Sequence, residues 1–389
     1  MTERGGEPAE PGQACGRHLA SGYDLVIFDL DGVVYLVDRP IPGAVEALSR
    51  LHADGRPVAY ATNNAARRPA EVAKVLSGMD VPATEAQVLT SAQAAAAALA
   101  ERFPPGARVL VVGSDGLRAE VDQVGLVPVR GADDAPVAVV QGYGPGVGWA
   151  DLAEACVAVR AGAVWVATNT DPTLPTVRGP LPGNGSLVAA LATALDRRPD
   201  LVVGKPEPTL FATAARRAGA GRALVVGDRL DTDIEGAHRA GMDSLLVLTG
   251  VSRPAELLTA PPARRPTYLA ADLRGLYEVD GAVRIPVGAA LPARDGGWCG
   301  SADDGGGWRV SVDDDGGLCL DGAGSALPAL RQLCAAAWAA APGTPPEARR
   351  GPTTGTASEP GAAQRCAEQP VRLRAASDAA REALAALGL

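Results

Sequence analysis

Short apolar runs recur between residues 25 and 248, and each run ends at small or polar residues. Runs this short and this evenly apolar are typical of parallel strands that are buried on both faces. Longer stretches with helical spacing separate the runs. This alternation predicts an α/β fold with a doubly wound parallel sheet, in which ligands bind at the carboxyl ends of the strands. The predicted strands are Leu25–Leu30, Val58–Thr62, Val109–Gly113, Val137–Gln141, Val164–Thr168, Leu201–Gly204, Ala223–Gly227 and Ser244–Leu248, and the predicted helices are Pro42–Ala53, Ala92–Arg102, Trp149–Ala161, Leu187–Leu195 and Thr209–Ala218.

The pattern changes after about residue 281. Trp308–Val312 and Leu318–Leu320 flank an Asp- and Gly-rich turn and are predicted to form a hairpin. Ala326–Ala341 and Val371–Leu387 are predicted helices, and the Pro-, Gly- and Thr-rich residues 342–370 between them are predicted to be a linker. We interpret residues 282–389 as a separate accessory module, whose deletion we expect to preserve the function of the rest.

Composition excludes several classes of function. The 389 residues suit two or three domains, and the net charge of −9 argues against a nucleic-acid partner, which needs a basic face. The first twenty residues lack an apolar core of the signal-peptide kind, and no apolar run reaches membrane-spanning length. The six cysteines are scattered, without a C-x-x-C pair, so neither a zinc site nor a disulfide framework is indicated. We therefore expect a reduced, cytoplasmic protein without a membrane partner.

Two carboxylates lie at the end of the first predicted strand. Strand alternation points Asp29 and Asp31 the same way, so their like charges crowd together unless a cation or a proton intervenes. Gly32 lets the chain turn sharply after them. A lone D-x-D sequence is often only a solvated loop, so this signal needs support from elsewhere in the chain.

Three further polar clusters follow predicted strands and supply that support. Thr62, Asn63 and Asn64 offer hydroxyl and amide donors to an anion. Lys205 follows a later run, and Gly227-Asp228-Arg229-Leu230-Asp231-Thr232-Asp233 follows another. If these strands belong to one α/β sheet, the four clusters meet at one edge.

Lys205 is also unusual in its residue type. The chain has 36 Lys and Arg residues, of which only Lys74 and Lys205 are lysine. A compact ammonium and a broad guanidinium are not interchangeable at a crowded anion site. A lysine kept inside a motif is therefore a candidate functional residue, whereas Lys74 has no such context.

With these four clusters in order, residues 23–275 resemble the haloacid-dehalogenase phosphatase superfamily. The long insertion resembles the α/β cap of its NagD-like subfamily, as do Ala167–Asp171 and Pro182–Ser186. The fourth block is similar to that of phosphoglycolate phosphatases, and the Arg-rich chain with its added module looks most like actinobacterial glycerol-3-phosphate phosphatases. The resemblance implies a core in two parts (22–84 and 199–281) and a cap (85–198). The Gly-, Pro- and Glu-rich residues 1–21 are predicted to be disordered, and the C-terminal module (282–389) follows the core.

The resemblance also implies a mechanism and a cofactor. Asp29 would be the nucleophile that becomes an aspartyl-phosphate. Mg²⁺ would be held by Asp29, the backbone carbonyl of Asp31 and Asp228, and Asp233 would orient its waters. Asp31 would act as general acid and then as general base. The phosphoryl oxygens would be bound by Thr62, Asn63, Asn64 and Lys205.

Several alternatives stay open. The same aspartyl-phosphate chemistry serves phosphotransferases and mutases, and a regulatory protein acting through residues 282–389 is a third possibility. The expected substrate is a small phosphorylated metabolite, with glycerol 3-phosphate as the best candidate. The sequence does not identify the ester, because specificity is expected in cap loops near Thr168–Asp171 and Arg178–Ser186. The oligomeric state is also open, with a homodimer as one alternative.

Overall fold

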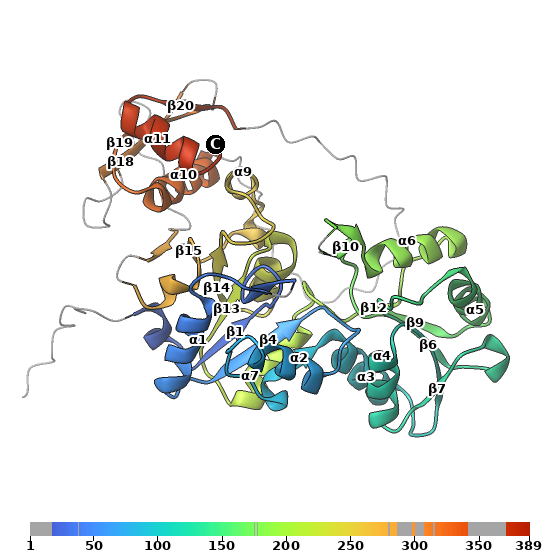
Figure 1. Ribbon diagram of the computed structural model, residues 1–389. Helices are drawn as coiled ribbons and strands as arrows, with labels where there is room; N and C mark the ends of the chain where they lie inside the picture. Colours follow the sequence, from blue (N-terminus) through green and yellow to red (C-terminus); the bar gives the residue numbers. More distant parts are fainter. Residues whose placement is uncertain are drawn as a thin grey trace, which may run out of the picture.

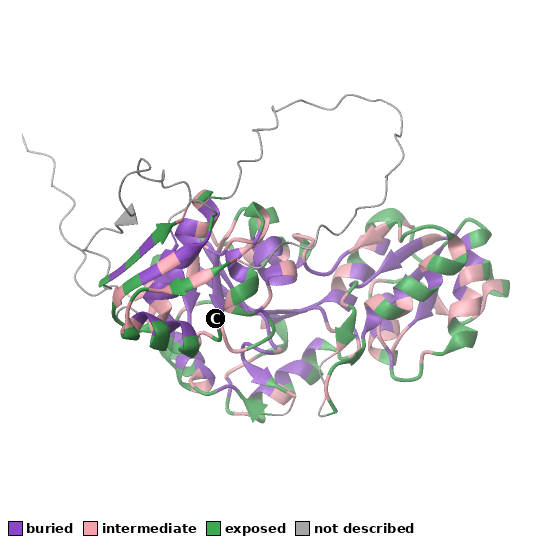
Figure 2. Ribbon diagram, turned by 90° about the horizontal axis from the view of Figure 1, so that it is seen from above, coloured by how far each residue is buried: buried purple, intermediate pink, exposed green. Residues whose placement is uncertain are grey.

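A computed structural model describes most of the chain: residues 18–37, 39–174, 176, 178–278, 281–285, 298–299, 307–313, 316–340 and 371–389. Three sheets with their helices account for the larger elements (Figure 1). A seven-stranded sheet lies at one end, a five-stranded sheet lies beside it, and a four-stranded C-terminal sheet packs near the first. In both larger bodies the strands are mostly buried and the outer faces of the helices are exposed (Figure 2).

The seven-stranded sheet has the order β16-β15-β14-β13-β1-β4-β5. All neighbouring strands are parallel except β15 and β16. Alternate residues of each strand face opposite sides, so one face packs on helices α1 and α2 and the other on α7. These elements are β1 (Leu25–Phe28), β4 (Val58–Thr62), β5 (Val88–Thr90), β13 (Ala223–Gly227), β14 (Asp243–Val247), β15 (Tyr268–Ala270), β16 (Ala282–Arg284), α1 (Ala44–Ala53), α2 (Pro69–Ser77) and α7 (Thr209–Ala218).

The five-stranded sheet has the order β12-β9-β8-β6-β7 and is parallel throughout. One face packs on α3 and α4, and the other packs on α5 and α6 around the fully buried Trp165. The elements are β6 (Arg108–Val112), β7 (Val127–Val129), β8 (Ala138–Gln141), β9 (Val164–Ala167), β12 (Leu201–Val202), α3 (Ser91–Arg102), α4 (Asp115–Gln123), α5 (Trp149–Arg160) and α6 (Asn184–Leu195). The predicted architecture, a doubly wound parallel α/β core with an inserted α/β cap, is confirmed, and the five-stranded sheet is the sheet of that insertion.

Three predicted domain boundaries do not coincide with the sheets. Strand β5 (Val88–Thr90) pairs with β4 in the first sheet, although we assigned residues 85–198 to the cap. Strand β12 (Leu201–Val202) pairs with β9 in the second sheet, although we assigned residue 199 onward to the core. Strand β16 (Ala282–Arg284) completes the first sheet, although we assigned it to the C-terminal module. All three are edge strands of two or three residues. Periodicity did not reveal β5 and β16, which are too short, whereas β12 was predicted as part of Leu201–Gly204 but assigned to the wrong sheet.

The C-terminal module contains the predicted hairpin, with longer strands than predicted, and the predicted helix that begins at Ala326. Strand β18 (Gly307–Val312) pairs antiparallel with β19 (Leu318–Ala323), and α10 (Ala326–Ala340) covers them. The predicted helix Val371–Leu387 is wrong in its first part. Residues Leu373–Ala375 form β20, parallel to β19, and the Ser377 hydroxyl caps α11 (Asp378–Ala386) by accepting from the N–H of Ala380. Strand β17 (Trp298–Cys299) completes this sheet, and the predicted linker at 342–370 lies outside the described residues.

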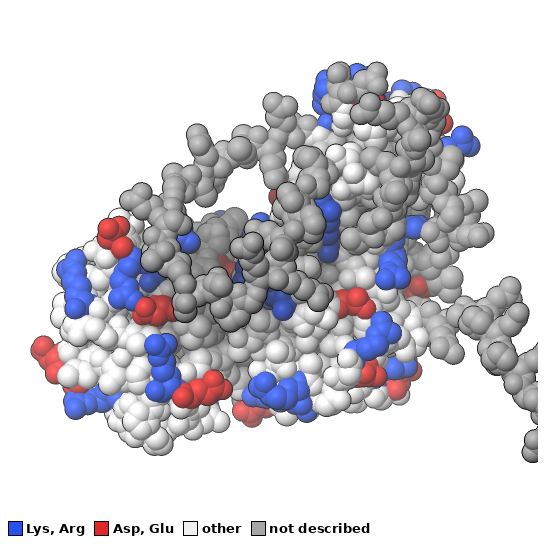
Figure 3. All heavy atoms as spheres, turned by 180° about the vertical axis from the view of Figure 1, so that it is seen from behind, with Lys and Arg blue, Asp and Glu red and all other residues white. Residues whose placement is uncertain are grey.

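Two further expectations concern the ends and the surface. Leu19–Gly22 forms a 3-10 helix with Ala20 buried, so the prediction of disorder is wrong for residues 19–21, while residues 1–17 lie outside the described part of the chain. Within that part, no helix is long and apolar enough to cross a bilayer. On the face seen in Figure 3, basic and acidic side chains of the described residues are interspersed.

Candidate active site

Three of the four predicted clusters meet at the carboxyl ends of neighbouring strands. Asp29 follows β1, Thr62 ends β4 and Asp228 follows β13, and β1 lies between the other two strands. Because these strands are parallel, their carboxyl ends share one edge of the sheet, and the crevice there is the usual ligand site of such folds. All three side chains are buried.

Lys205 reaches the same place from a different sheet than we predicted. It follows β12 at the edge of the five-stranded sheet, and its ammonium extends to the core carboxylates. The distance from Lys205 Nζ is 2.5 Å to Asp29 Oδ1 and 2.7 Å to Asp233 Oδ1. Lys205 therefore joins the core cluster as we expected. Its strand β12, however, belongs to the five-stranded sheet and not to the sheet that carries the other three clusters.

One turn of π-helix brings Asp233 back to this cluster. Residues Leu230–Ile234 form the turn, and π-turns occur frequently at functional sites. The N–H of Arg229 donates to Asp233 Oδ2 at 3.1 Å, which fixes the carboxylate. Asp233 is fully buried, so its carboxylate needs these partners.

Burial raises the pKa of three aspartates in and beside this cluster. It raises the pKa of Asp29 well above its usual range, and the positive charge of Lys205 opposes this rise. Burial, together with the charge of Asp233, raises the pKa of Asp228 to about 7. Burial also raises the pKa of Asp31, again opposed by Lys205. For Lys205, burial acts to lower the pKa, but the charges of Asp233 and Asp29 outweigh it and raise the pKa.

The cluster has the oxygen ligands and the negative charge that a hard divalent cation needs. Side-chain oxygens of Asp29, Asp228 and Asp233 lie within 4.8 Å of one another. Asp228 Oδ2 accepts from the N–H of Val251 at 2.6 Å, whereas its Oδ1 is buried without a hydrogen-bond partner. A buried orphan carboxylate oxygen beside two more carboxylates is the oxygen-rich environment that Mg²⁺ prefers. The residues present therefore fit the expected metal.

The predicted anion-binding residues are arranged in more than one way. The Thr62 hydroxyl accepts from the N–H of Asn64 at 3.1 Å and keeps its own hydrogen for a ligand. Asn64 Oδ1 accepts from the N–H of Ala66 at 2.8 Å, which leaves the Asn64 amide hydrogens available. Asn63, in contrast, uses its side-chain amide on Lys205 and Asp171, so only its backbone remains for an anion.

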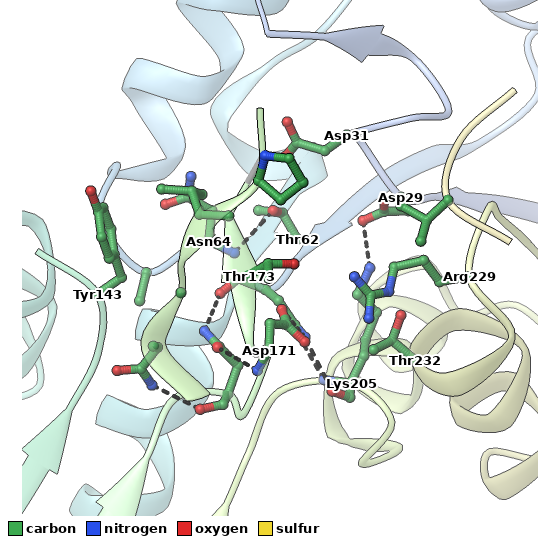
Figure 4. A pocket seen from close by; sticks show the side chains of 18 residues that line it. Asp29, Asp31, Thr62, Asn64, Tyr143, Asp171, Thr173, Lys205, Arg229 and Thr232 are labelled. Carbon is green, nitrogen blue, oxygen red and sulfur yellow. Dashed lines mark hydrogen bonds and ion pairs between the residues drawn. The ribbon is translucent and has the colours of Figure 1, made fainter. Parts of the chain in front are cut away.

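These residues line a cavity between the two larger sheets (Figure 4). Its volume is about 230 Å³, below the roughly 300–1,000 Å³ of pockets that take drug-sized ligands. In Figure 4, Asp29, Lys205 and Arg229 lie on one side of the cavity and Tyr143 on the other. Residues outside our predicted set also line it, and the motif match around Ala167–Asp171 and Pro182–Ser186 was the only signal for several of them; they include Tyr143, Asn169, Asp171, Thr173, Asn184 and Arg229.

Family models match three parts of the chain. A model described as haloacid dehalogenase-like hydrolase matches residues 26–127, and one described as HAD-hydrolase-like matches residues 202–276. The C-terminal module matches a GCN5-related N-acetyltransferase-like domain over residues 305–357. The first two matches contain all the predicted site residues.

Comparison with individual proteins agrees with these matches. The chain is 52% identical over 262 residues to D-glycerol 3-phosphate phosphatase of Mycobacterium tuberculosis, a span of 67% of this chain and 73% of that protein. A crystal structure of glycerol phosphate phosphatase from Mycobacterium tuberculosis with magnesium is similar over 95% of this chain and 98% of that one, at 43% identity and a TM-score of 0.77. A solved structure described as a putative NagD protein matches 66% of this chain and 98% of that one, at 31% identity and a TM-score of 0.60. The chain therefore belongs to the haloacid dehalogenase-like hydrolase family.

Proposed function

We propose that this protein is a Mg²⁺-dependent phosphatase of a small phosphomonoester, with Asp29 as the nucleophile. The observation that carries the proposal is the buried cluster of Asp29, Asp228, Asp233 and Lys205 beside Asp31 at the carboxyl edge of the first sheet. A carboxylate that attacks a phosphate dianion meets strong repulsion, and this cluster holds the groups that offset it.

The metal would be held by the Asp29 carboxylate, the Asp31 backbone carbonyl and Asp228, with Asp233 orienting bound waters. When bound, Mg²⁺ neutralises charge on the phosphoryl group and on the attacking oxygen. The orphan Oδ1 of Asp228 and the two neighbouring carboxylates support this assignment.

The remaining chemistry belongs to side chains of this chain. The Asp29 carboxylate attacks phosphorus in line, and the P–O bond to the alcohol breaks as the Asp29–phosphate bond forms. Asp31 donates its proton to the leaving alkoxide, and it then takes a proton from the water that cleaves the aspartyl-phosphate. The Lys205 ammonium, the Thr62 hydroxyl, the Asn64 amide and the backbone of Asn63 would bind the phosphoryl oxygens.

Glycerol 3-phosphate is the proposed substrate. The 52% identity to a D-glycerol 3-phosphate phosphatase supports it, and so does a cavity of about 230 Å³ that suits a compact ester. Fold alone does not fix the ester, because the residues that we propose to contact the alcohol lie in loops of the inserted sheet, near Thr168–Asp171 and Arg178–Ser186. We further propose that the protein acts in the cytoplasm, without nucleic acid, and size-exclusion chromatography with light scattering would decide between monomer and homodimer.

The test is release of inorganic phosphate by the purified protein with Mg²⁺. The panel contains glycerol 3-phosphate, 2-phosphoglycolate, pyridoxal phosphate, nucleoside monophosphates and p-nitrophenyl phosphate, each with an EDTA control. We expect metal-dependent turnover that is highest on glycerol 3-phosphate. Asp29→Asn should abolish both turnover and acid-trapped aspartyl-phosphate, because it removes the nucleophile. Phosphate release by this variant near the wild-type rate would refute the covalent scheme, and turnover highest on another ester would refute the substrate.

A further inference from the structure

The side-chain amide of Asn63 binds both backbone polar groups of Lys205. Asn63 Oδ1 accepts from the Lys205 N–H at 2.7 Å, and Asn63 Nδ2 donates to the Lys205 carbonyl at 3.1 Å. A single amide thus pairs with one residue in the way a neighbouring strand would. Since β12 ends at Val202, no ladder of that strand holds Lys205, and Asn63 takes this role from the first sheet.

The pairing is buried and closely packed. Asn63 is 8% exposed and Lys205 is 3% exposed, so neither backbone group can exchange its partner for water without cost. Gly204 permits the approach, because a Cβ there would lie 2.7 Å from Asn63 Oδ1 and 2.4 Å from the Thr168 carbonyl. The main chain of Lys205 is therefore fixed at the point from which its ammonium reaches Asp29 and Asp233.

The second amide hydrogen of Asn63 is held from the inserted sheet. Asn63 Nδ2 lies 3.0 Å from Asp171 Oδ2 and 3.2 Å from Asp171 Oδ1, and Asp171 belongs to the loop after β9. In the same loop, Asn169 Nδ2 donates to the Asn63 carbonyl at 2.7 Å. With Lys205 on one side and Asp171 on the other, the Asn63 amide has spent its acceptor and both of its donors.

We propose that Asn63 is a positioning residue for Lys205, and that Asp171 of the inserted sheet latches Asn63 in the conformation that holds the lysine. The Lys205 ammonium is then placed for catalysis only when the loop after β9, which contains Asp171, lies against the core. This inference rests on the proposed function, because the placement of Lys205 matters for turnover only if Asp29 accepts the phosphoryl group.

The experiment compares full-length Asn63→Ala, Asp171→Ala, Asp171→Asn and the Asn63→Ala/Asp171→Ala pair with wild type, and Gln123→Ala serves as a surface amide control. We measure kcat and KM with Mg²⁺, and the inhibition constant of orthovanadate, which mimics the pentacoordinate phosphorus. A displacement of a catalytic group by about 1 Å can cost about 10²-fold in rate. We therefore expect Asn63→Ala to lower kcat on the order of 10²-fold and to weaken the binding of vanadate in parallel. A smaller fraction of folded enzyme would lower the apparent kcat but would leave the inhibition constant of vanadate unchanged.

Asp171 separates a latch from a direct substrate contact. Asp171→Ala should lower kcat by about tenfold, the size of one hydrogen bond, whereas Asp171→Asn keeps an acceptor for Asn63 and should stay near wild type. Because Asp171 acts through Asn63, the double variant should be no slower than Asn63→Ala. Multiplied losses in the double variant, or an Asp171→Asn variant as slow as Asp171→Ala, would overturn the latch.

Hydrogen exchange tests, independently of activity, whether Asn63 holds the main chain of Lys205. In Asn63→Ala the Lys205 amide should lose protection, while amides of β13 stay protected as in wild type. Unchanged protection of Lys205 would overturn the positioning role. A wild-type chain that hydrolyses none of the esters would refute the proposed function instead, and the exchange result would still decide whether Asn63 holds Lys205.

Discussion

Lys205 carries its charge in a place where an isolated ammonium would lose it. Burial alone lowers a lysine pKa, yet the charges of Asp233 and Asp29 reverse the direction here. The two oxygens lie 2.7 and 2.5 Å from one nitrogen, a geometry that suits a compact ammonium better than a planar guanidinium. This explains why a chain that uses Arg for nearly every other cation has lysine at this position.

The role of Asp31 as general acid can be tested by comparing substrates whose leaving groups differ in their need for a proton. It lines the cavity, and burial raises its pKa, so it can hold the proton that an alkoxide needs. We expect Asp31→Asn to lower kcat for glycerol 3-phosphate on the order of 10²–10⁴-fold, the usual size of general acid–base catalysis. The loss should shrink for p-nitrophenyl phosphate, whose leaving group needs no proton. Equal losses on the two esters, measured by phosphate release, would argue against Asp31 as the acid.

At the scale of elements, the loop after β14 presses on the acidic cluster. A Cβ at Gly250 would lie 1.9 Å from Asp228 Oδ2, although the backbone of Gly250 does not need a left-handed conformation. We expect Gly250→Ala to displace Asp228, to raise the Mg²⁺ concentration for half-maximal activity several-fold, and to cost about 1–3 kcal/mol of stability as overpacking does.

The matched control is Gly146→Ala, since a Cβ at Gly146 meets no atom within 4 Å. Activity titrated against Mg²⁺ and thermal unfolding would be measured for both variants. Identical Mg²⁺ curves for Gly250→Ala and Gly146→Ala would mean that the loop does not position Asp228.

Sequence predicted the elements that are long and buried, and the residues that follow them. The β1, β4 and β13 strands are uniformly apolar, so Asp29, Thr62 and Asp228 could be placed at one edge from pattern alone. The edge strands β5 and β16 could not be found, because three residues carry no period, and the sequence did not show that the predicted strand at β12 joins the second sheet. The contact of Asp171 with Asn63 spans 108 positions and depends on how the inserted sheet seats on the core, which no local pattern records.

At the scale of the whole molecule, the C-terminal module shares a hydrophobic core with the first sheet. One cluster joins Leu246 and Leu269 of the sheet to Leu330 and Trp338 of α10, and α9 (Pro254–Leu258) contributes Leu257. Trp338 Nε1 donates to the Leu257 carbonyl at 3.0 Å, and the Arg265 guanidinium lies 5.1 Å from the Trp338 ring centroid. A module that packs in this way supports the body that carries Asp228, so we revise our expectation that it is dispensable.

Removal of residues 282–389 would take away β16 and uncover this cluster. We expect a chain that ends at residue 281 to be less soluble and to unfold at a lower temperature than the full chain, with turnover lost because the fold fails and not because a motif is missing.

Trp338→Ala in the full chain isolates the packing effect: Trp338 is 7% exposed, and truncation of a buried Trp costs about 3–5 kcal/mol. Arg381→Ala, on the exposed face of α11, is the control and should change stability little. Chemical denaturation with phosphate release measured in parallel would check all three chains, and a shortened chain as stable and active as the full protein would show that the shared core is not needed.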